Sequence, residues 1–306
     1  MDSVQKSPSN IFIELCNRKV SNGDEPIAMV TAYDAPTMRF AKNADVVLVG
    51  DSAAMVVMGY ESTMSITHNE MLMLVKSVVR TNEKNTDRKP IIADMVWGSY
   101  HVSIEKTIES AIELIQAGAH AVKIEGGANR VETIKALVDA QIPVVGHIGL
   151  TPQSILSLGK YGVVGKDFEQ AKAVLSDAHK VVNAGVSMLV VECVPDGLSR
   201  TITEEVSVPV IGIGAGRHVD GQVLVMHDLL GIKDGSRNSA KFVREYSNVE
   251  EVAIDSVSAF VNDVKKGTFP SSEETYHMSD DLEKYLKSAK SGAVTELISN
   301  LTEQNQ

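Results

Sequence analysis

The feature that most constrains the fold of this chain is a regular alternation between short apolar runs and longer stretches of helical period. The eight short runs are rich in β-branched residues, and such runs are typical of parallel strands that are buried on both faces. They are IAMVTAY at 27–33, VVLVG at 46–50, PIIADM at 90–95, AVKIEG at 121–126, VVGHIG at 144–149, MLVVEC at 188–193, PVIGIG at 209–214 and VLVMHD at 223–228.

The stretches between these runs supply the helices. Residues 103–119 open on a serine that can cap a helix, continue with apolar residues at i, i+3 and i+4 spacing, and stop at Gly118. Residues 131–141 and 168–185 show the same pattern. Eight strand–helix units in about 200 residues predict an α/β fold, a closed (β/α)8 TIM barrel rather than an open doubly wound sheet. About eight residues separate the last two runs, which is too few for an ordinary crossover helix.

The composition indicates which kinds of binding partner and which cellular location to expect. The net charge of −11 argues against a nucleic acid partner, because phosphate binding needs a concentrated basic surface. The chain has no run of about 18 apolar residues for a membrane span, and its first residues have no signal-peptide or transit-peptide pattern. With only two cysteines, we expect a cytoplasmic protein with reduced thiols. We expect disorder over residues 1–10, a barrel domain over residues 11–277 and a polar helical extension over residues 278–306.

Polar residues gather where the predicted strands end. In a barrel of this type the active site lies at the carboxyl ends of the strands. A buried charge without a partner is too costly to keep, so such a cluster must be neutralised by a cation, by a lysine or by shared protons. The residues are Asp51 and Ser52 after the second run, Asp94 in the third, Lys123 and Glu125 on one face of the fourth, His147 in the fifth and Glu192 in the sixth.

The acidic side chains indicate a hard metal ion. Asp51, Asp94 and Glu125 would offer carboxylate oxygens without nearby cysteines or paired histidines, a donor set that suits Mg²⁺ better than zinc. A 2-oxo acid could chelate such an ion through its carboxylate and keto oxygens, with Lys123 and Ser52 holding the carboxylate. The ion would then act as a Lewis acid and lower the cost of an enolate.

A base is still required for the adjacent C–H proton, and Glu192 is the candidate. A structural alternative exists for several of these residues. Asp51 could be a turn former or a helix cap. Lys123 and Glu125 could form a salt bridge within a barrel layer. His147 fits a hydrogen-bonded core residue, or one that orients its neighbours, better than a catalyst.

The glycine-rich segment GIGAG at 212–216 supports a different enzyme class. Glycine-rich turns after the seventh strand of a barrel often bind phosphate through backbone N–H groups, as expected of a phosphosugar or phosphoenolpyruvate enzyme. Alternatively, the turn allows close approach of a neighbouring loop. A third hypothesis is a barrel that has lost catalysis and acts as a binding protein.

Six ordered blocks make the chain similar to the 3-methyl-2-oxobutanoate (ketopantoate) hydroxymethyltransferase family over residues 11–277. The resemblance implies a barrel of the phosphoenolpyruvate mutase and isocitrate lyase type, assembled as a homo-oligomer, usually a decamer. It matches no residue of this chain to the binding site of the family's folate co-substrate. The blocks are MVTAYDAP at 29–36, VLVGDSAAMVVMGYEST at 47–63, AHAVKIEGG at 119–127, PVVGHIGLTPQS at 143–154, ECVP at 192–195 and IGIGAGRHVDGQVLVMHDLLG at 211–231.

The resemblance also implies the reaction. A hydroxymethyl group passes from 5,10-methylenetetrahydrofolate to 3-methyl-2-oxobutanoate, giving 2-dehydropantoate for pantothenate and coenzyme A synthesis, with Mg²⁺ as cofactor. In this family the matching positions act as metal ligands, as oxo-acid contacts and as the general base. They are Asp51, Asp94 and Glu125 for the metal, Asp51, Ser52, Asp94 and Lys123 for the oxo acid, and Glu192 for the base.

Overall fold

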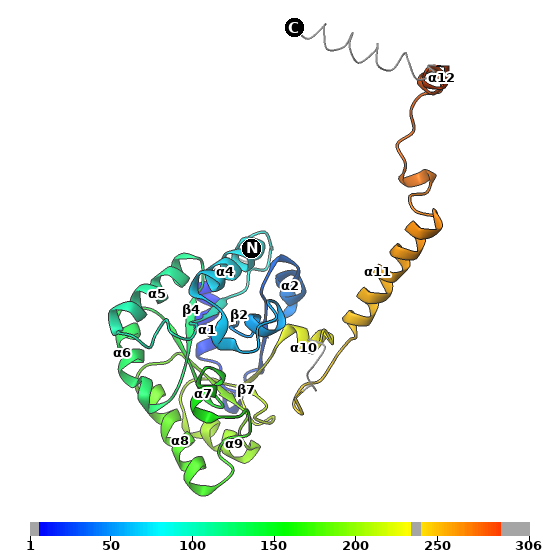
Figure 1. Ribbon diagram of the computed structural model, residues 1–306. Coiled ribbons are helices and arrows are strands. Elements are labelled where there is room, and N and C mark those ends of the chain that lie inside the picture. The colour runs from blue at the N-terminus through cyan, green and yellow to red at the C-terminus, as the bar shows by residue number, and fades with distance from the viewer. Residues whose placement is uncertain (1–5, 234–239, 289–306) are drawn as a thin grey trace. The chain divides into compact units, whose positions relative to one another are not determined.

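The computed structural model describes residues 6–233 and 240–288, and its centre is a closed barrel of eight parallel strands (Figure 1). Each strand pairs with the next along the chain, and β8 closes the barrel against β1. The predicted TIM barrel is confirmed, and β1 to β7 fall inside the predicted runs. The strands are β1 (Ile27–Thr31), β2 (Val46–Val49), β3 (Ile91–Asp94), β4 (Ala121–Glu125), β5 (Val144–Gly149), β6 (Met188–Glu192), β7 (Val210–Ile213) and β8 (Gly221–Leu224).

Helices surround the strands, and the three that the sequence predicted most clearly are present as α5, α6 and α8. Ser103 caps α5 by accepting a hydrogen bond from Lys106 N, as its sequence position indicates. The helices are α1 (Pro8–Cys16), α2 (Ala35–Phe40), α3 (Ala53–Val56), α4 (His68–Asn82), α5 (Ile104–Gln116), α6 (Val131–Asp139), α7 (Ile155–Leu158), α8 (Phe168–Asn183), α9 (Asp196–Glu205), α10 (Met226–Leu230), α11 (Val249–Lys266) and α12 (Asp280–Ser288).

The eighth strand differs from its prediction. The run at 223–228 was expected to be extended, but β8 begins at Gly221 and ends at Leu224, and α10 follows from Met226. The side-chain oxygen of Thr31 accepts a hydrogen bond from Met226 N at 2.8 Å, which takes that N–H out of the strand ladder. Apolar runs alone do not distinguish a strand end from a helix start. Residues 214–220 join β7 to β8 without a helix, in agreement with the short spacing.

The interior of the barrel is closed at the amino-terminal end of the strands by α1. Phe12 and Leu15 of this helix pack with inward-facing strand residues such as Met29 and Val145. A second and larger apolar layer lies between the strands and the surrounding helices. The carboxyl-terminal end of the barrel is therefore the end left available for a ligand.

A buried ion pair reinforces the closed end. Lys19 Nζ donates hydrogen bonds to Asp220 Oδ2 at 2.7 Å and to the carbonyl oxygens of Thr203 and Val208 at 2.7 and 3.3 Å. Asp220 Oδ2 also accepts from Val210 N at 2.9 Å. All three donors of this lysine have partners, which is the condition under which a buried charge is tolerated.

The described ends of the chain correct one expectation and leave another as a prediction. Helix α1 begins at Pro8, so the expected disorder over residues 1–10 is wrong for residues 8–10, while residues 1–5 lie outside the described part. The contacts divide the chain into Met1–Glu250 and Glu251–Gln306. This boundary precedes the predicted domain end at 277, and the assignment 11–277 stays a prediction.

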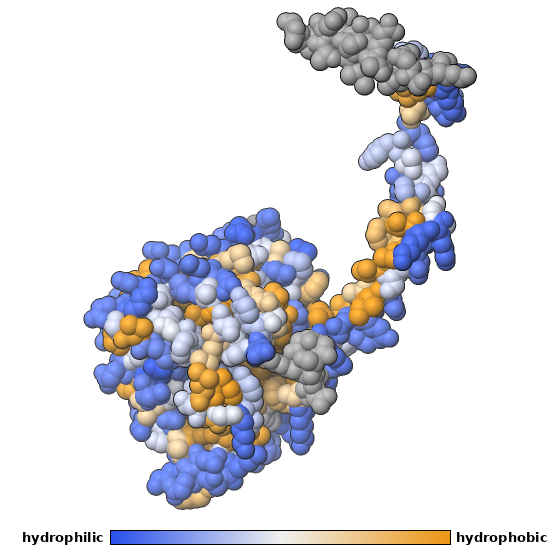
Figure 2. Space-filling model, viewed as in Figure 1, coloured by the Kyte–Doolittle hydropathy of each residue, from blue (hydrophilic) through white to orange (hydrophobic). Residues whose placement is uncertain are grey.

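In the second unit, the described residues 251–287 are all exposed. Within the predicted extension at 278–306, α12 is helical and residues 289–306 lie outside the described part. Figure 2 shows hydrophobic side chains gathered along α11, beside hydrophilic ones. Its exposed apolar residues include Val252, Val257, Phe260 and Val264. Among the described helices, none combines the length and apolarity that crossing a bilayer requires.

Candidate active site

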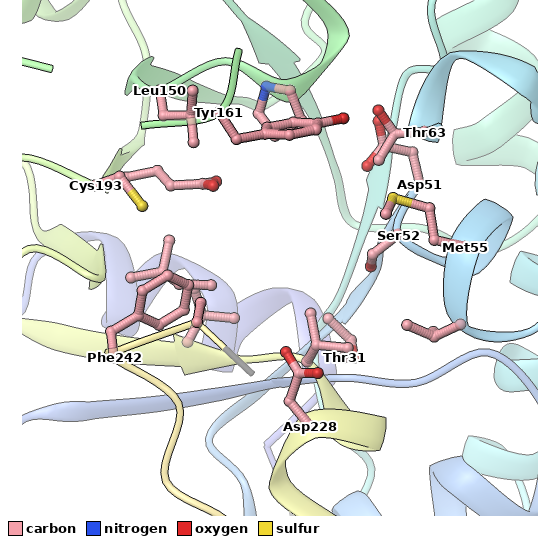
Figure 3. Close-up of a pocket in the computed structure, with 18 of the residues that line it drawn as sticks. Thr31, Asp51, Ser52, Met55, Thr63, Leu150, Tyr161, Cys193, Asp228 and Phe242 are labelled. Carbon is pink, nitrogen blue, oxygen red and sulfur yellow. The ribbon is translucent and has the colours of Figure 1, made fainter. Parts of the chain in front are cut away.

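All seven residues predicted for the site line one cavity of about 550 Å³ at the carboxyl ends of the strands. Figure 3 shows part of it, with Asp51 and Ser52 on one wall and Leu150 and Cys193 opposite. Parallel strands end on the same side of the barrel, which is why residues from five strand ends meet here. The residues are Asp51, Ser52, Asp94, Lys123, Glu125, His147 and Glu192.

Two aspartates from neighbouring strands are held together at the end of β2. Asp51 N donates a hydrogen bond to Asp94 Oδ2 at 2.9 Å. Gly50 leaves room for the Ser52 side chain, since a Cβ at that position would lie 2.9 Å from Ser52 Oγ. The GDS segment therefore combines a glycine required by space with two polar side chains that face the cavity.

Lys123 lies among these acids. Its Nζ is 3.1 Å from Asp94 Oδ1, 4.0 Å from Glu125 Oε1 and 3.2 Å from His147 Nδ1. Burial opposes the charge of Lys123, but Asp94, Glu125 and Asp51 outweigh it and raise the pKa of the lysine. Lys123 is therefore a permanent cation that neutralises part of the acidic cluster.

His147 connects the acids on the β4 side with Glu192. Its Nδ1 is 3.3 Å from Glu125 Oε1, and its Nε2 is 3.2 Å from Glu192 Oε2. Burial and Lys123 lower the pKa of His147, while Glu125 and Glu192 raise it, with a net rise to about 9. Against the effect of burial, His147 and Lys123 lower the pKa of Glu125. The role of His147 as a residue that orients its neighbours stays a prediction.

Even with Lys123 and His147 as partners, the acidic side chains of the cluster carry more negative charge than these two residues neutralise. Burial, followed by repulsion from Asp94 and Glu125, raises the pKa of Asp51 well above its ordinary value. The buried Oδ1 of Asp94 accepts no hydrogen bond from the described residues, although Lys123 is near it. A raised carboxyl pKa in a buried cluster with more acids than cations is typical of a site that binds a cation.

The three predicted metal ligands are not equally available. Over residues 6–233 and 240–288, no group of three His, Cys, Asp or Glu side chains is arranged to hold a metal ion by itself. Glu125 is engaged on both oxygens: Oε2 accepts from Gln153 N at 2.9 Å, and Oε1 lies near His147. The set of Asp51, Asp94 and Glu125 is therefore not preformed, and its role stays a prediction.

Two positioning residues were missed by the sequence reasoning. Gln153 Nε2 donates to Asp51 Oδ2 at 2.9 Å, and its Oε1 accepts from Tyr100 OH at 2.6 Å. Tyr33 OH and Ser52 Oγ are 2.7 Å apart. Gln153 and Tyr33 both lie inside the quoted sequence blocks, so a polar residue just past a strand was the available signal.

The glycine-rich turn after β7 is explained by close packing. A Cβ on Gly214 would lie 2.7 Å from the ring of Phe242 and 3.2 Å from Cys193 Sγ. Gly214 also has a φ of +62°, which an L side chain rarely adopts. Of the two readings of GIGAG, close approach of a neighbouring segment is the one that fits this geometry.

Comparison with known proteins decides the family. Residues 13–272 match the family model described as ketopantoate hydroxymethyltransferase. The chain belongs to the ketopantoate hydroxymethyltransferase family. The predicted family and enzyme class are thereby confirmed, and the chain is a hydroxymethyltransferase.

Bacterial relatives of this family align over most of the chain. A 3-methyl-2-oxobutanoate hydroxymethyltransferase from Thermoanaerobacter sp. (strain X514) is 47% identical over 262 residues, which cover 85% of this chain and 93% of the relative. The enzyme of the same name from Geobacillus thermodenitrificans (strain NG80-2) is 46% identical over 266 residues, covering 86% and 93%.

Solved structures show the same fold at low identity. A 2,3-dimethylmalate lyase, described as a PEP mutase/isocitrate lyase superfamily member, has a TM-score of 0.54 at 13% identity, covering 92% of this chain and 99% of that chain. A phosphonopyruvate hydrolase complexed with oxalate and Mg²⁺ has a TM-score of 0.55 at 12% identity, covering 93% and 99%. These likenesses agree with the closed barrel of eight parallel strands.

Proposed function

We propose that the cavity at the carboxyl ends of the strands carries out the family reaction with Mg²⁺ and 5,10-methylenetetrahydrofolate. The methylene carbon of the folate is transferred to C3 of 3-methyl-2-oxobutanoate, water supplies the hydroxyl, and tetrahydrofolate leaves. The product is 2-dehydropantoate for pantothenate and coenzyme A synthesis. One observation carries the proposal. The Asp51–Asp94 pair, short of positive charge, and Glu192 line the same cavity, with Lys123 and His147 between them.

The donor set fits magnesium. Mg²⁺ usually binds through one or two carboxylates and completes its shell with water and substrate oxygens. Asp51 and Asp94 would hold it, because Asp94 Oδ1 is buried without a hydrogen bond from the described chain. Glu125 would act through a water molecule, since its own oxygens are engaged by Gln153 and His147. The hydrolase of the same fold complexed with oxalate and Mg²⁺ supports this assignment.

The chain's own residues then bind the oxo acid and move its proton. Lys123 supplies a cation, and Ser52, held by Tyr33 OH, supplies a hydroxyl for the substrate carboxylate. Glu192 is the base that removes the C3 proton, and its Oε2 lies 3.2 Å from His147 Nε2. When bound, magnesium would stabilise the negative charge that develops on the keto oxygen.

Three further expectations belong to this proposal. The hydroxymethyl donor is a folate, which a cavity of about 550 Å³ has room to hold beside a five-carbon acid. Copies of the chain assemble into a homo-oligomer, a decamer by family resemblance, and the exposed apolar side chains of α11 support association. The location is cytoplasmic, in agreement with the reduced thiols of Cys16 and Cys193.

The test separates proton removal from group transfer. With Mg²⁺ and no folate, the protein should exchange the C3 hydrogen of 3-methyl-2-oxobutanoate for deuterium from D2O, followed by NMR. Adding methylenetetrahydrofolate should give 2-dehydropantoate, detected by mass spectrometry. EDTA should abolish both reactions, and excess Mg²⁺ should restore them. Neither exchange nor product in the presence of magnesium would contradict the proposal.

The phosphoenolpyruvate-type alternative predicts different ligands. Such an enzyme should be stabilised by phosphonopyruvate or phosphate in a thermal unfolding experiment, and should not be stabilised by 3-methyl-2-oxobutanoate. A protein that only binds would be stabilised by the oxo acid and would release neither deuterated substrate nor product.

A further inference from the structure

The strands contribute two different kinds of side chain to the wall of the cavity. Strands β3 to β5 contribute the charged or titratable residues Asp94, Lys123, Glu125 and His147. Strands β6 to β8 contribute one acid and three apolar residues, which are Glu192, Val190, Ile213 and Val223. At the level of the strands, the cavity is therefore polar on one side and, apart from Glu192, apolar on the other.

Two of the apolar residues lie next to the proposed base. Val190 precedes Glu192 by two positions on β6, so both side chains point to the same face of the strand. Ile213 is the register partner of Glu192 on β7. Both belong to the apolar interior of the barrel, where Val190 is 2% exposed and Ile213 is half-buried. A carbon that Glu192 deprotonates therefore lies beside these two side chains.

The oxo acid of the proposed reaction has the same division into a polar and an apolar end. Its carboxylate and keto oxygens form one end, and C3 carries two methyl groups at the other. With the oxygens held by Lys123 and the Asp51–Asp94 pair, and the C3 proton directed at Glu192, the methyl groups would point toward β6 and β7. The reverse orientation would bury the methyl groups among charges and deprive those charges of polar partners, which is costly.

We propose that Val190 and Ile213 bind the two methyl groups on C3 and set the largest side chain that the 2-oxo acid can carry. Both residues are β-branched, so their side chains are stiff about χ1 and yield little to a larger ligand. One methylene group too many or too few in an apolar pocket changes kcat/KM about 10- to 200-fold. This inference rests on the proposed function, which supplies the oxo acid and the role of Glu192.

The test measures folate-free exchange of the C3 hydrogen in D2O with Mg²⁺, for 3-methyl-2-oxobutanoate and for racemic 3-methyl-2-oxopentanoate, which is larger by one methylene. Ile213→Val and Val190→Ala each enlarge the pocket. Each should raise the kcat/KM of the larger acid relative to the smaller one about tenfold, compared with the same ratio in the wild-type protein. Because all proteins are compared on the same two acids, the different intrinsic acidity of the acids cancels.

Two matched controls remove the same atoms from the barrel interior away from the cavity. Ile211 lies two positions before Ile213 on β7, and Val145 is an inward-facing residue of β5; both are fully buried. Ile211→Val and Val145→Ala should therefore change the preference between the two acids less than threefold. A general loosening of the barrel would change the preference in the controls as well.

The reciprocal substitution fills the pocket. Val190→Ile adds a methyl group and should shift the preference about tenfold from 3-methyl-2-oxobutanoate toward 2-oxobutanoate, which has one methyl group fewer on C3. An unchanged preference in the three cavity variants, or an equal shift in the two controls, overturns the inference and leaves the proposed function standing. A wild-type protein that exchanges none of these acids overturns the proposed function and the inference with it.

Discussion

The two ends of the barrel each bury a lysine beside an aspartate, and they do so in different ways. At the closed end, Lys19 has three oxygen acceptors and Asp220 accepts hydrogen bonds on both oxygens. At the open end, Lys123 lies among several acids, and one oxygen of Asp94 accepts no hydrogen bond from the described residues. All four residues are at most 8% exposed, so burial does not distinguish the ends.

The difference shows how a buried ion pair serves stability at one end and reactivity at the other. A pair whose hydrogen bonds are all made can gain nothing from another ligand, and losing either partner leaves a costly buried charge. A buried cluster with more acids than cations and a raised carboxyl pKa gains when a cation arrives. We therefore expect substitutions at the closed end to change folding and substitutions at the open end to change chemistry.

The largest expected effect is at Glu192. Replacing Glu192 by Gln keeps its shape and removes the base, so the rate of C3 hydrogen exchange should fall about 10²- to 10⁴-fold while urea unfolding is unchanged. Glu205→Gln is the control, because this exposed glutamate pairs with His179 of α8 and should leave exchange unaffected. Exchange at the wild-type rate in Glu192→Gln would remove Glu192 from the mechanism.

At the closed end we expect a substitution to lower stability and to leave catalysis unchanged. Lys19→Met strands the buried carboxylate of Asp220 and should cost about 3–5 kcal/mol in the free energy of unfolding by urea. The folded fraction should keep the wild-type kcat. Lys6→Met, which breaks the exposed pair with Glu14, should change stability little. A loss of kcat in folded Lys19→Met would mean that the two ends are coupled.

The response to magnesium should distinguish Asp94 at the open end of the barrel from Asp220 at the closed end. At about 100 times its Kd, Mg²⁺ should stabilise the wild-type protein by about 2.7 kcal/mol, measured as a rise in Tm. Asp94→Asn should abolish that rise, and it should lower the Tm of the metal-free protein less than Asp220→Asn does, because relief of the repulsion with Asp51 offsets part of the lost ion pair with Lys123. Asp220→Asn should lower the Tm and keep the response to magnesium. The reverse pattern would place the metal elsewhere.

The smallest effect concerns the thiol at the open end. Burial, and then the charge of Glu192, raise the pKa of Cys193 from 9.0 to about 11. A raised thiol pKa keeps the protonated form to higher pH, so the thiolate fraction between pH 8 and 10 should rise about 100-fold in the native protein and about tenfold in urea. Iodoacetamide labelling of Cys193, followed by peptide mass spectrometry, measures this difference. Equal pH profiles in native and unfolded protein would contradict it.

Most of the fold could be predicted because its signals are local. Apolar runs and helical periods lie within short segments, and seven of the eight strands coincide with such runs. The eighth was misplaced because VLVM reads alike at a strand end and at a helix start. The hydrogen bond that Met226 N, at the start of α10, donates to Thr31 joins residues 195 positions apart. No local sequence pattern contains such a pair.

The candidate site divides in the same way. Sequence alone determined that Asp51, Asp94, Lys123, Glu125 and Glu192 meet at one end of a barrel, because parallel strands end together and residues two apart share a face. Only the tertiary structure decided that Gln153 engages Asp51 and Glu125, that Lys19 pairs with Asp220, and that α10 turns Asp228 into the cavity. The physical reason is that hydrogen bonds act over about 3 Å in space, whereas their partners are separated by up to 201 residues in the chain.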